Sequence, residues 1–389
     1  MSEYLDKQTV EQHLYQKIVP FWNKTLDPIY GGFYGRVSNN LEIEPFTTKG
    51  AVQLSRILWS YSALYNYHPQ KEFLDLANLA FSFLKTYLWD QEHQGLFWST
   101  TYDGIVFDST KHIYAQAFAI YGLTEFYLAS KDTGSLELAL QLYEVIEQKA
   151  YNPKNNSYWE SFNYQWEPNV NKHLSSETVK PVYTSNLVIH LVEAYTNLYR
   201  VAPSKRLKQS VEKLLQCFYE RIYQKDMKSC YLFFDQDWKV MAKEVSYGHD
   251  IETSWLFDLT FKELQIESAD YQKMTIDLAI TAFQNGYYDG YFYSERRDNQ
   301  MIKEVVWWVQ AEVMIGLLNL AKKTGYAEYF KAVKKTWDIT MKEIVDQRDG
   351  GEWFWSTSCH IGNMTHGMSE EWKANYHNIR ACLEIMKRS

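Results

Sequence analysis

The chain has 389 residues, enough for one large domain or for two or three of ordinary size. Its formal net charge of −8 and its pI near 5.7 argue against a nucleic-acid-binding surface. The N-terminal residues are polar and no apolar run approaches the length of a membrane span, so we expect a cytoplasmic protein without a signal peptide.

A short aromatic turn recurs along the chain at intervals of 60 to 73 residues. Its clearest copy reads Gly-Gly-Phe at residues 31–33, and weaker copies begin at Gly95, Ser157, Cys230, Gly290 and Gly351. A fixed period over a whole chain indicates one supersecondary unit repeated many times. Six units cover nearly the whole sequence, so we expect a single domain over residues 1–389.

Helical periodicity fills the segments between the turns. Apolar residues recur at helical spacing, as in Phe118, Tyr121, Gly122 and Phe126 at i, i+3, i+4 and i+8. In chain order, helices are predicted at residues 3–22, 50–67, 73–88, 112–130, 136–148, 184–200, 204–223, 250–264, 271–285, 307–323, 326–345 and 376–388. They alternate between a more polar helix and a helix of small and apolar residues.

Six helical hairpins that each bury one face can close into a ring. The sequence therefore predicts an all-α fold, an (α/α)6 barrel with inner and outer helices. An open solenoid is the alternative, but the terminal units show no polar capping face. The recurring aromatic turns are then expected to form short β-hairpins at one mouth of the barrel.

Polar residues recur near the first turn of the inner helices, at similar distances after each aromatic turn. They are Arg56, Tyr114, Asn186, His190, His249, Glu252, Trp308 and His377. If the units are equivalent, these side chains converge at one mouth of the barrel. Convergent polar groups in an apolar concavity are the usual mark of an active site.

Three of the ten histidines, His190, His249 and His377, belong to this set. A lone histidine on a helix is more often structural, but three at equivalent places favour a functional group. His112 opens an inner helix and is either a fourth member or a helix-end residue. The remaining histidines are expected at the surface, on outer helices or loops: His13, His68, His93, His173, His360 and His366.

The local sequence around His249 is the most informative of the three. Glu252 follows three residues later on the same helical face, where its carboxylate is expected to orient the imidazole. Asp250 is interpreted as a carboxylate at the helix N-terminus.

Metal and glycosidase chemistry fit the polar set less well than proton transfer does. Histidines and a glutamate are possible zinc ligands, but there is no H-E-x-x-H motif, so we expect no metal. The cysteines contain no C-x-x-C pair and are expected to be free thiols: Cys217, Cys230, Cys359 and Cys382. A glycosidase requires two opposed carboxylates, and Glu252 alone stands out at an inner mouth.

Histidines together with an arginine suit proton transfer at a carbon next to a carbonyl group. Imidazole titrates near neutrality and can act as acid or base. A fixed guanidinium such as Arg56 can stabilise the enolate oxygen. Bases on opposite faces of the carbon produce epimerisation, whereas one base shuttling between C1 and C2 produces aldose–ketose isomerisation. Neither reaction requires a cofactor.

Several motifs of the chain together resemble those of a known family. They lie at residues 31–35, 55–59, 111–121, 186–195, 306–312, 350–353 and 372–378, and the sharpest is Ser-Tyr-Gly-His-Asp-Ile-Glu at residues 246–252. With these motifs the chain resembles the N-acylglucosamine 2-epimerase superfamily and, within it, the cellobiose 2-epimerases. The resemblance spans nearly the whole chain.

The resemblance implies an (α/α)6 barrel that interconverts glucose and mannose configuration at C2 of a reducing-end sugar, without a metal or cofactor. It implies that His249 and His377 are the acid/base pair, acting through a cis-enediolate whose oxygen is stabilised by Arg56. Glu252 would support His249. The sugar would be held by His190, Asn186 and Tyr114 and stacked on Trp308 and Trp372, with Trp307 either stacking or facing the core.

The chain departs from the cellobiose-epimerase pattern at Leu54, Ala115, Gln116 and residues 181–183. These positions are expected to lie nearer to the distal sugar than to the reacting carbon. A mannose 2-epimerase acting on free monosaccharide, an aldose–ketose isomerase and a non-catalytic sugar-binding barrel therefore remain alternatives. In each case the expected partner is a small sugar, and the expected state is a monomer or weak homodimer.

Overall fold

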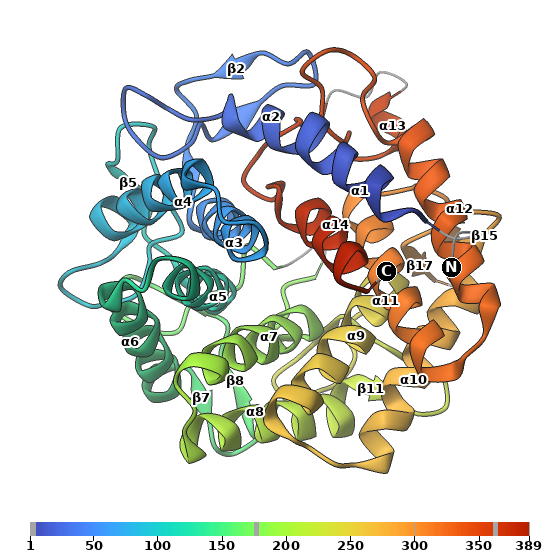
Figure 1. The fold of residues 1–389 in the computed structure, drawn as a ribbon. Coiled ribbons are helices and arrows are strands. Elements are labelled where there is room, and N and C mark those ends of the chain that lie inside the picture. The colour runs from blue at the N-terminus through green and yellow to red at the C-terminus, as the bar shows by residue number, and fades with distance from the viewer. Residues whose placement is uncertain (1–4, 175–178, 299, 361–364, 389) are drawn as a thin grey trace.

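The helices of the computed structural model form an inner and an outer ring (Figure 1). The structure describes residues 5–174, 179–298, 300–360 and 365–388. The inner ring consists of α3 (Ala51–Tyr67), α5 (Ile113–Ser130), α7 (Ser185–Val201), α9 (Tyr247–Leu264), α11 (Trp307–Thr324) and α14 (Tyr376–Arg388). Each inner helix packs on the next, and α14 packs on α3, so the ring is closed. The (α/α)6 barrel is confirmed and the open solenoid is wrong.

One outer helix covers each inner helix. The outer ring consists of α1 (Lys7–His13) continuing through the π-helical turn η1 (Leu14–Ile18) into α2 (Val19–Asn23), α4 (Lys71–Phe83) with η2 (Leu84–Leu88), α6 (Thr133–Lys149), α8 (Lys205–Cys217) with η3 (Phe218–Ile222), α10 (Ala269–Gly286) and α12 (Ala327–Glu343). A short helix, α13 (Thr357–His360), lies in the last connection. Helix α9 begins at Tyr247, three residues earlier than predicted, because the Ser246 hydroxyl accepts the His249 backbone N–H and caps the helix.

The inner helices are buried on all sides, unlike the one-sided pattern predicted for them. In α5 every residue from Ile113 to Phe126 is buried. The outer helix α8 instead buries a single stripe, at Leu207, Ser210, Val211, Leu214 and Leu215. An inner helix has the outer ring on one side and the barrel interior on the other, so both of its faces leave water.

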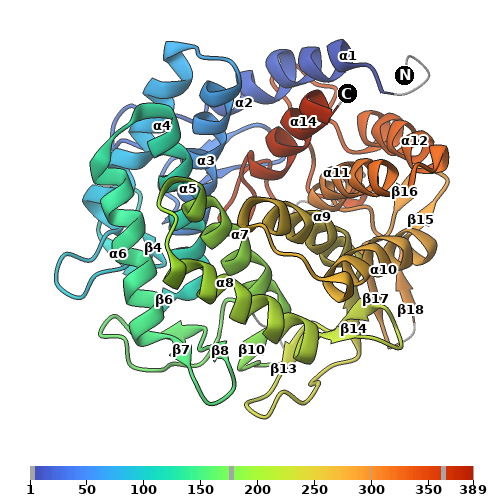
Figure 2. The same cartoon turned by 60° about the horizontal axis from the view of Figure 1, so that its bottom comes forward.

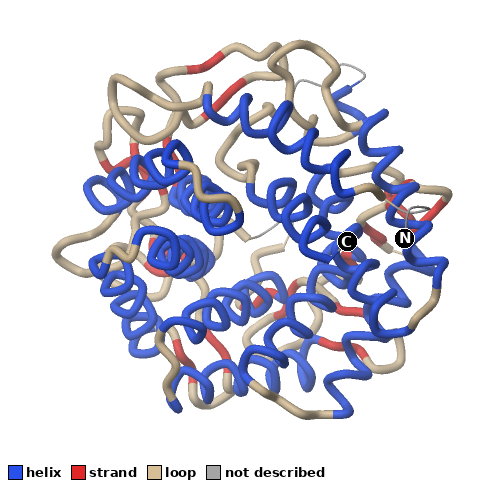
Figure 3. Tube along the Cα trace, in the orientation of Figure 1, coloured by secondary structure: helices blue, strands red, loops and turns tan. Residues whose placement is uncertain are grey.

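Each aromatic turn is closed by antiparallel pairing, as expected from the sequence. Three turns are hairpins: β7 (Tyr151–Asn152) with β8 (Ser157–Tyr158), β11 (Tyr223–Gln224) with β12 (Ser229–Cys230), and β15 (Tyr287–Tyr288) with β16 (Tyr291–Phe292). Single bridges close the other three, at Leu26↔Phe33, Trp89↔Leu96 and Val345↔Trp353. Most of the labelled strands lie toward one end of the barrel (Figure 2), and Figure 3 shows how short they are beside the helices.

A second set of strands joins each unit to the next at this same end. The strand before an inner helix pairs with the strand after the following turn. The pairs are β3 (Lys49–Gly50) with β4 (Ser99–Thr100), β6 (Lys111–His112) with β9 (Ser161–Phe162), β10 (Tyr183–Thr184) with β13 (Phe233–Phe234), and β14 (Glu244–Ser246) with β17 (Glu295–Arg297). A third strand extends two of these sheets: β5 (Val106–Asp108) pairs with β4, and β18 (Gln300–Ile302) pairs with β17. Strands β1 (Arg36–Val37) and β2 (Ile43–Glu44) form a separate pair. This pairing holds the N-termini of the inner helices at the strand-bearing end.

In several inner helices, a polar side chain of the first turn forms hydrogen bonds with the backbone of the aromatic turn in its own unit. Gln116 bonds both the N–H and the carbonyl of Leu96, at 2.7 and 2.8 Å. Gln310 donates to the carbonyl of Phe292, and Asp250 accepts the backbone N–H of Cys230. The recurring turn therefore sets the position of the inner helix behind it, which places equivalent helix residues at equivalent heights.

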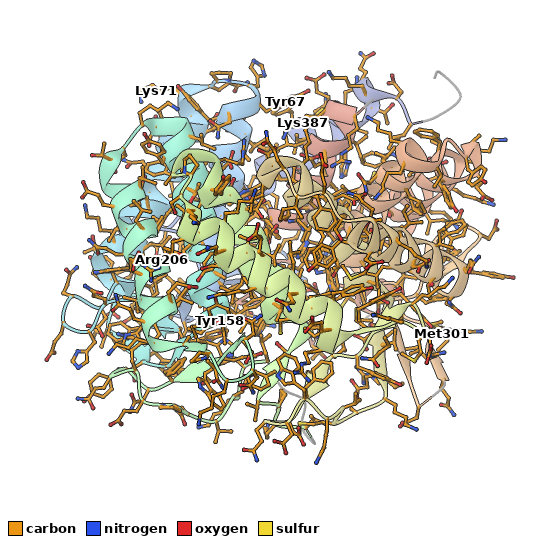
Figure 4. The ribbon with its side chains drawn as sticks, turned by 90° about the horizontal axis from the view of Figure 1, so that it is seen from below. Tyr67, Lys71, Tyr158, Arg206, Met301 and Lys387 are labelled. Atoms are coloured by element: carbon orange, nitrogen blue, oxygen red, sulfur yellow. The ribbon has the colours of Figure 1, made fainter. Side chains whose placement is uncertain are left out.

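The four cysteines are buried free thiols, as expected. None of the described helices combines the length and apolar character that a membrane span requires. Figure 4 shows the two ends of the barrel from the side: Tyr67, Lys71 and Lys387 lie at one end, and the strand residues Tyr158 and Met301 lie toward the other.

Candidate active site

A cavity of about 400 Å³ opens at the strand-bearing end of the barrel. All ten residues singled out in the sequence line it: Arg56, Tyr114, Asn186, His190, His249, Glu252, Trp307, Trp308, Trp372 and His377. Its wall also contains nine residues that the sequence did not suggest: His173, Leu174, Thr184, Ser185, Leu232, Phe233, Glu295, Trp355 and His366. The N-termini of the inner helices surround the cavity, so their dipoles favour negative charge developing inside it.

His249 and His377 both pack against the Trp308 ring. The centroid of that ring is 4.9 Å from the imidazole of His249 and 5.5 Å from that of His377. His249 Nδ1 lies 2.8 Å from the Ser246 hydroxyl, and His377 Nδ1 lies 2.7 Å from Glu312 Oε1. Because Nδ1 is engaged by a protein partner in both rings, Nε2 is the nitrogen available to a molecule in the cavity.

Both of these imidazoles are neutral at pH 7. Burial lowers the pKa of His249 to about 3, although Glu312 acts in the opposite direction. Burial also lowers the pKa of His377 well below 6.5, and the positive charges of Arg56 and Arg380 lower it further. A neutral imidazole that donates from Nδ1 to a carboxylate presents Nε2 as a base, and His377 meets that description.

His190 lies deeper in the wall and is held by its own carboxylate. Its Nδ1 is 2.8 Å from Glu193 Oε2, and its ring stands perpendicular to Tyr114 at 5.2 Å. Burial lowers the pKa of His190, while the bond to Glu193 opposes that shift. Neighbouring Asn186 also lines the cavity, and its Oδ1 has no partner among the described residues.

Arg56 is a buried guanidinium whose charge is not neutralised by a neighbour. It donates to the backbone carbonyl of Trp372 at 2.8 Å and to the Tyr114 hydroxyl at 2.9 Å, and it lies 4.3 Å over the Phe118 ring. None of the described carboxylates forms a salt bridge with it. A buried cation with only neutral acceptors attracts an anion that forms in the cavity.

A second polar layer lies one helical turn below the histidines. Arg380 Nη2 donates to Glu252 at 2.6 Å and to Glu312 at 2.7 Å, and Nη1 forms a close hydrogen bond with Glu193. Glu193, Glu252 and Arg380 each follow one of the three histidines by three residues. This i, i+3 spacing was the sequence signal for the layer, and it was used only for Glu252.

The structure corrects two expectations about the carboxylates. Glu252 does not hydrogen-bond His249; it pairs with Arg380, and Ser246 is the partner of His249. Nor is the site poor in carboxylates, because three of them share one guanidinium. Although burial opposes it, Arg380 and His190 together lower the pKa of Glu193 to about 2. Burial and the charge of Glu312 raise the pKa of Glu252 well above its usual value.

Glu252, Glu312 and His377 are the one group of described side chains with the spacing of a metal site, their ligand atoms lying within 4.8 Å of one another. The Arg380 guanidinium binds both carboxylates of this group, so a positive charge already occupies the place of a cation. The donor set therefore does not fit a metal.

Activity is accordingly expected to survive metal chelation. Dialysis against EDTA should leave kcat and KM within about twofold of the untreated enzyme, since Arg380 supplies the charge that a metal would bring. The measurement is a rate before and after dialysis, with and without added divalent cations. A loss that zinc, manganese or magnesium restores would show that a metal takes part.

Two histidines expected at the surface line the cavity instead. His173 stacks on Trp98 with ring centroids 3.8 Å apart, and His366 stacks on Trp355 at 4.0 Å. Each pairs with a carboxylate, His173 with Asp108 and His366 with Glu370. Both lie in irregular segments outside the helices, where no periodicity marks a residue. The side chain of His360 lies outside the described residues.

His112 is a helix-end residue and not a fourth member of the site. Its Nδ1 accepts the backbone N–H of Tyr114 and caps α5, and its Nε2 lies 3.0 Å from Asn171. It is fully buried and does not line the cavity.

The burial of His112 makes a pH-dependent contribution to stability. Burial lowers its pKa from 6.5 to about 3, so below pH 6.5 the unfolded chain binds a proton that the folded chain excludes. Stability is therefore lost as the pH falls, by about 2 kcal/mol from this group between pH 6.5 and 5. His112→Asn keeps a capping side chain, and urea unfolding at both pH values should show the difference reduced by about that amount. Exposed His68→Asn is the control, and equal reductions in both variants would contradict the assignment.

The departures from the cellobiose-epimerase pattern lie away from the cavity. Leu54 and Ala115 are fully buried in the core, Gln116 grips the Leu96 turn, and Tyr183 stacks on Trp238 at 4.5 Å. None of these positions is among the described residues that line the cavity. Their nearness to a distal sugar stays a prediction.

Known proteins match both the sequence and the fold. The N-acylglucosamine 2-epimerase family model matches residues 32–381. Cellobiose 2-epimerase of Dictyoglomus turgidum is 35% identical over 384 residues, covering 98% of each chain. The solved cellobiose 2-epimerase of Bacillus thermoamylovorans B4167 is 38% identical, with a TM-score of 0.95 over 98% of this chain and 99% of that one. D-mannose isomerase of Marinomonas mediterranea is 21% identical, covering 98% of this chain and 97% of its own. The chain belongs to the N-acylglucosamine 2-epimerase family and is a sugar epimerase, an enzyme of the isomerase class.

Proposed function

We propose that the protein interconverts glucose and mannose configuration at C2 of a reducing-end sugar, as a 2-epimerase of the cellobiose type. The observation that carries this proposal is the pair of neutral imidazoles, His249 and His377, that share a cavity with the unneutralised guanidinium of Arg56. Two bases beside one carbon can remove a proton from one face and return one to the other. The guanidinium can stabilise the oxygen that becomes negative in between.

The reaction requires the open-chain aldehyde, because only there is the C2 proton next to a carbonyl group. One imidazole Nε2 takes the C2 proton, and the electron pair moves through C1 to O1, producing a cis-enediolate near Arg56. The other imidazole then delivers a proton to the opposite face of C2. His190, Asn186 and Tyr114 bind hydroxyl groups in this proposal, and Trp307 holds His377 by edge-on packing at 5.4 Å.

A disaccharide substrate is supported by an aromatic wall in which Trp372 and His173 line the cavity and buried Trp98 packs against both. The Trp372 ring lies 5.8 Å from Tyr114 and 5.6 Å from Trp98, and Trp98 in turn carries the stacked ring of His173. When the reacting sugar lies beside the histidines, this wall remains available to a second sugar ring, and aromatic faces bind such rings well. The cellobiose 2-epimerases at about 35% identity agree with that assignment.

Two other activities on the same site remain to be separated from this one. A mannose 2-epimerase would use the same bases on a free monosaccharide. An aldose–ketose isomerase would return the proton to C1 instead of C2, and the D-mannose isomerase relative motivates that test. Hydrolysis of a glycosidic bond is disfavoured because the described carboxyl groups at the cavity are already bonded. Glu193, Glu252 and Glu312 are bonded to Arg380, and Glu295 is bonded to Arg297.

One experiment distinguishes these activities. The protein is incubated in D₂O with cellobiose, mannobiose, glucose or mannose, and the products are followed by NMR. We expect the 2-epimer of the disaccharide, with deuterium at C2. A ketose as main product would replace the epimerase assignment with an isomerase, and reaction of mannose alone would replace the disaccharide. Cleavage of the glycosidic bond would exclude both.

A further inference from the structure

Glu252 is the carboxyl group of the reacting end of the cavity. It lines the cavity on the same helical face as His249, one turn further along α9. Among the described lining residues the other carboxyl is Glu295, which is partly exposed in β17 and bonds Arg297 at 2.7 Å. Glu252 is therefore the described carboxyl group in the part of the cavity wall nearest the histidines, where a sugar bound by them would approach it.

The surroundings of Glu252 hold too few positive charges for all the carboxylates to be ionised. Three glutamates, from α7, α9 and α11, surround Arg380 of α14, which is the one guanidinium bonded to them. Arg56 lines the same cavity and is a second cation, but two cations do not balance three carboxylates. Other titratable groups that face Glu252 or its partners are His249, His377, His190, Tyr114, Tyr121 and Tyr376. Buried charge without compensation is costly, so one carboxyl group of the three retains a proton.

Hydrogen-bond donors decide which glutamate that is. Glu193 faces three donors, from His190, Tyr376 and Arg380. Glu312 also faces three, from His377, Trp255 and Arg380. Among the described residues Glu252 faces Arg380 alone, at Oε1. Burial raises the pKa of both Glu252 and Glu312, so the donors decide between them. Donors stabilise the ionised form, so the proton stays on Glu252.

We propose that Glu252 is the general acid that opens the sugar ring, and that the protein therefore has a mutarotase activity separable from epimerisation. This inference rests on the proposed function, because it concerns the same sugar in the same cavity. It assigns ring opening to a carboxylic acid and an imidazole acting together, before either histidine touches C2.

The step balances in protons and electrons. The anomeric O1–H proton passes to Nε2 of His249, and an O1 lone pair becomes the second bond of C1=O1. The C1–O5 bond breaks, its electron pair stays on O5, and O5 takes the proton of Glu252. In the reverse step O5 attacks C1, Glu252 recovers its proton from O5, and O1 takes the proton from the imidazole. Attack on either face of the carbonyl forms either anomer.

The same transfer explains how two neutral imidazoles carry out an epimerisation. After ring opening His249 carries the former O1 proton. His377 then takes the C2 proton, and His249 delivers its own to the other face of C2. At ring closure His377 returns a proton to O1, so each group regains its starting state and no proton from solvent is needed.

The test compares mutarotation with epimerisation in matched variants. Conversion of freshly dissolved α-D-glucose to the β anomer is followed by polarimetry, and 2-deoxy-D-glucose, which lacks the C2 hydroxyl, reports ring opening alone. Glu252→Gln keeps an oxygen for Arg380 but has no acidic proton, so we expect its acceleration of mutarotation to fall by about 100-fold. The partly buried Glu263→Gln, near the far end of α9, is the control and should match wild type.

His377→Ala supplies the second arm, because it should lose epimerisation and keep mutarotation. Wild-type mutarotation should be at least as fast as epimerisation on the same sugar. The inference would be overturned if the Glu252→Gln variant accelerated mutarotation at the wild-type rate, or if the wild-type protein epimerised sugar without accelerating mutarotation. Either result would leave the proposed function intact. Glu252-dependent mutarotation without any 2-epimer would instead refute the proposed function. If Glu252→Gln does not fold, the His377→Ala comparison and the wild-type rate ratio still decide.

Discussion

The His377→Ala and His249→Ala variants are each expected to lose epimerase activity, with kcat lower by about 10³-fold. Each substitution removes one of the two imidazoles proposed to act on C2, and a single base cannot serve both faces of that carbon. In His377→Ala the Glu312 carboxylate remains, but it no longer has an imidazole through which to act as a base on C2. Initial rates of 2-epimer formation, measured by NMR at saturating sugar, provide the comparison.

The fold of these variants should survive, because both side chains face a cavity. His68→Ala is the matched control, since His68 is exposed at the end of α3 and should leave kcat unchanged. Circular dichroism and the urea midpoint test whether the variants are folded. A residual rate above about a tenth of wild type in either histidine variant would disprove the two-base scheme.

The Arg380→Met variant is expected to lose about 3 to 5 kcal/mol of stability, because it leaves Glu193, Glu252 and Glu312 buried without their shared cation. Methionine fills a similar volume, so the loss reports charge more than packing. Urea unfolding at pH 7 measures the free energy of unfolding. His377 would also lose part of the anchor for its Glu312 partner, so kcat should fall in the folded fraction.

Arg206→Met is the control for an exposed ion pair. Arg206 pairs with Glu144 on the outer ring, with side-chain exposures of 54% and 43% (Figure 4), and its loss should cost less than about 1 kcal/mol. Adding Glu193→Gln to Arg380→Met should recover part of the lost stability, since Glu193 is held ionised beside Arg380 and its buried charge disappears with that of the arginine. Equal losses in the two arginine variants would mean that the buried cluster is not held by Arg380.

The barrel could be predicted because its causes are local and repeated. The turn at residues 31–33 and its five copies mark where each hairpin lies, and helical periodicity fills the distance between them. The structure adds the reason why the period matters: side chains such as Gln116 and Gln310 tie each inner helix to its own turn. Equivalent positions in the sequence therefore become equivalent positions around one cavity.

The pairing of Arg380 with the glutamates beneath the histidines could not be predicted from the sequence. Arg380 and Glu193 are 187 residues apart, and Arg380 and Glu252 are 128 apart. The i, i+3 spacing correctly placed Glu252 on the face of His249. It did not determine whether Glu252 would bond His249 or a residue of another helix. Arg380 on a helix across the barrel offers full charge and two donors, whereas His249 is already held by Ser246.

The amino-acid pattern was sufficient for the class of fold and for the height of the predicted residues in the cavity wall, because these follow from spacing along single helices. The pairing of three glutamates with one arginine, the neutral state of both imidazoles and the presence of His173 and His366 in the cavity wall depend on the closed ring. They depend on it because burial and charge are summed over all the helices that meet in the barrel, and irregular loops have no period that reveals where they point.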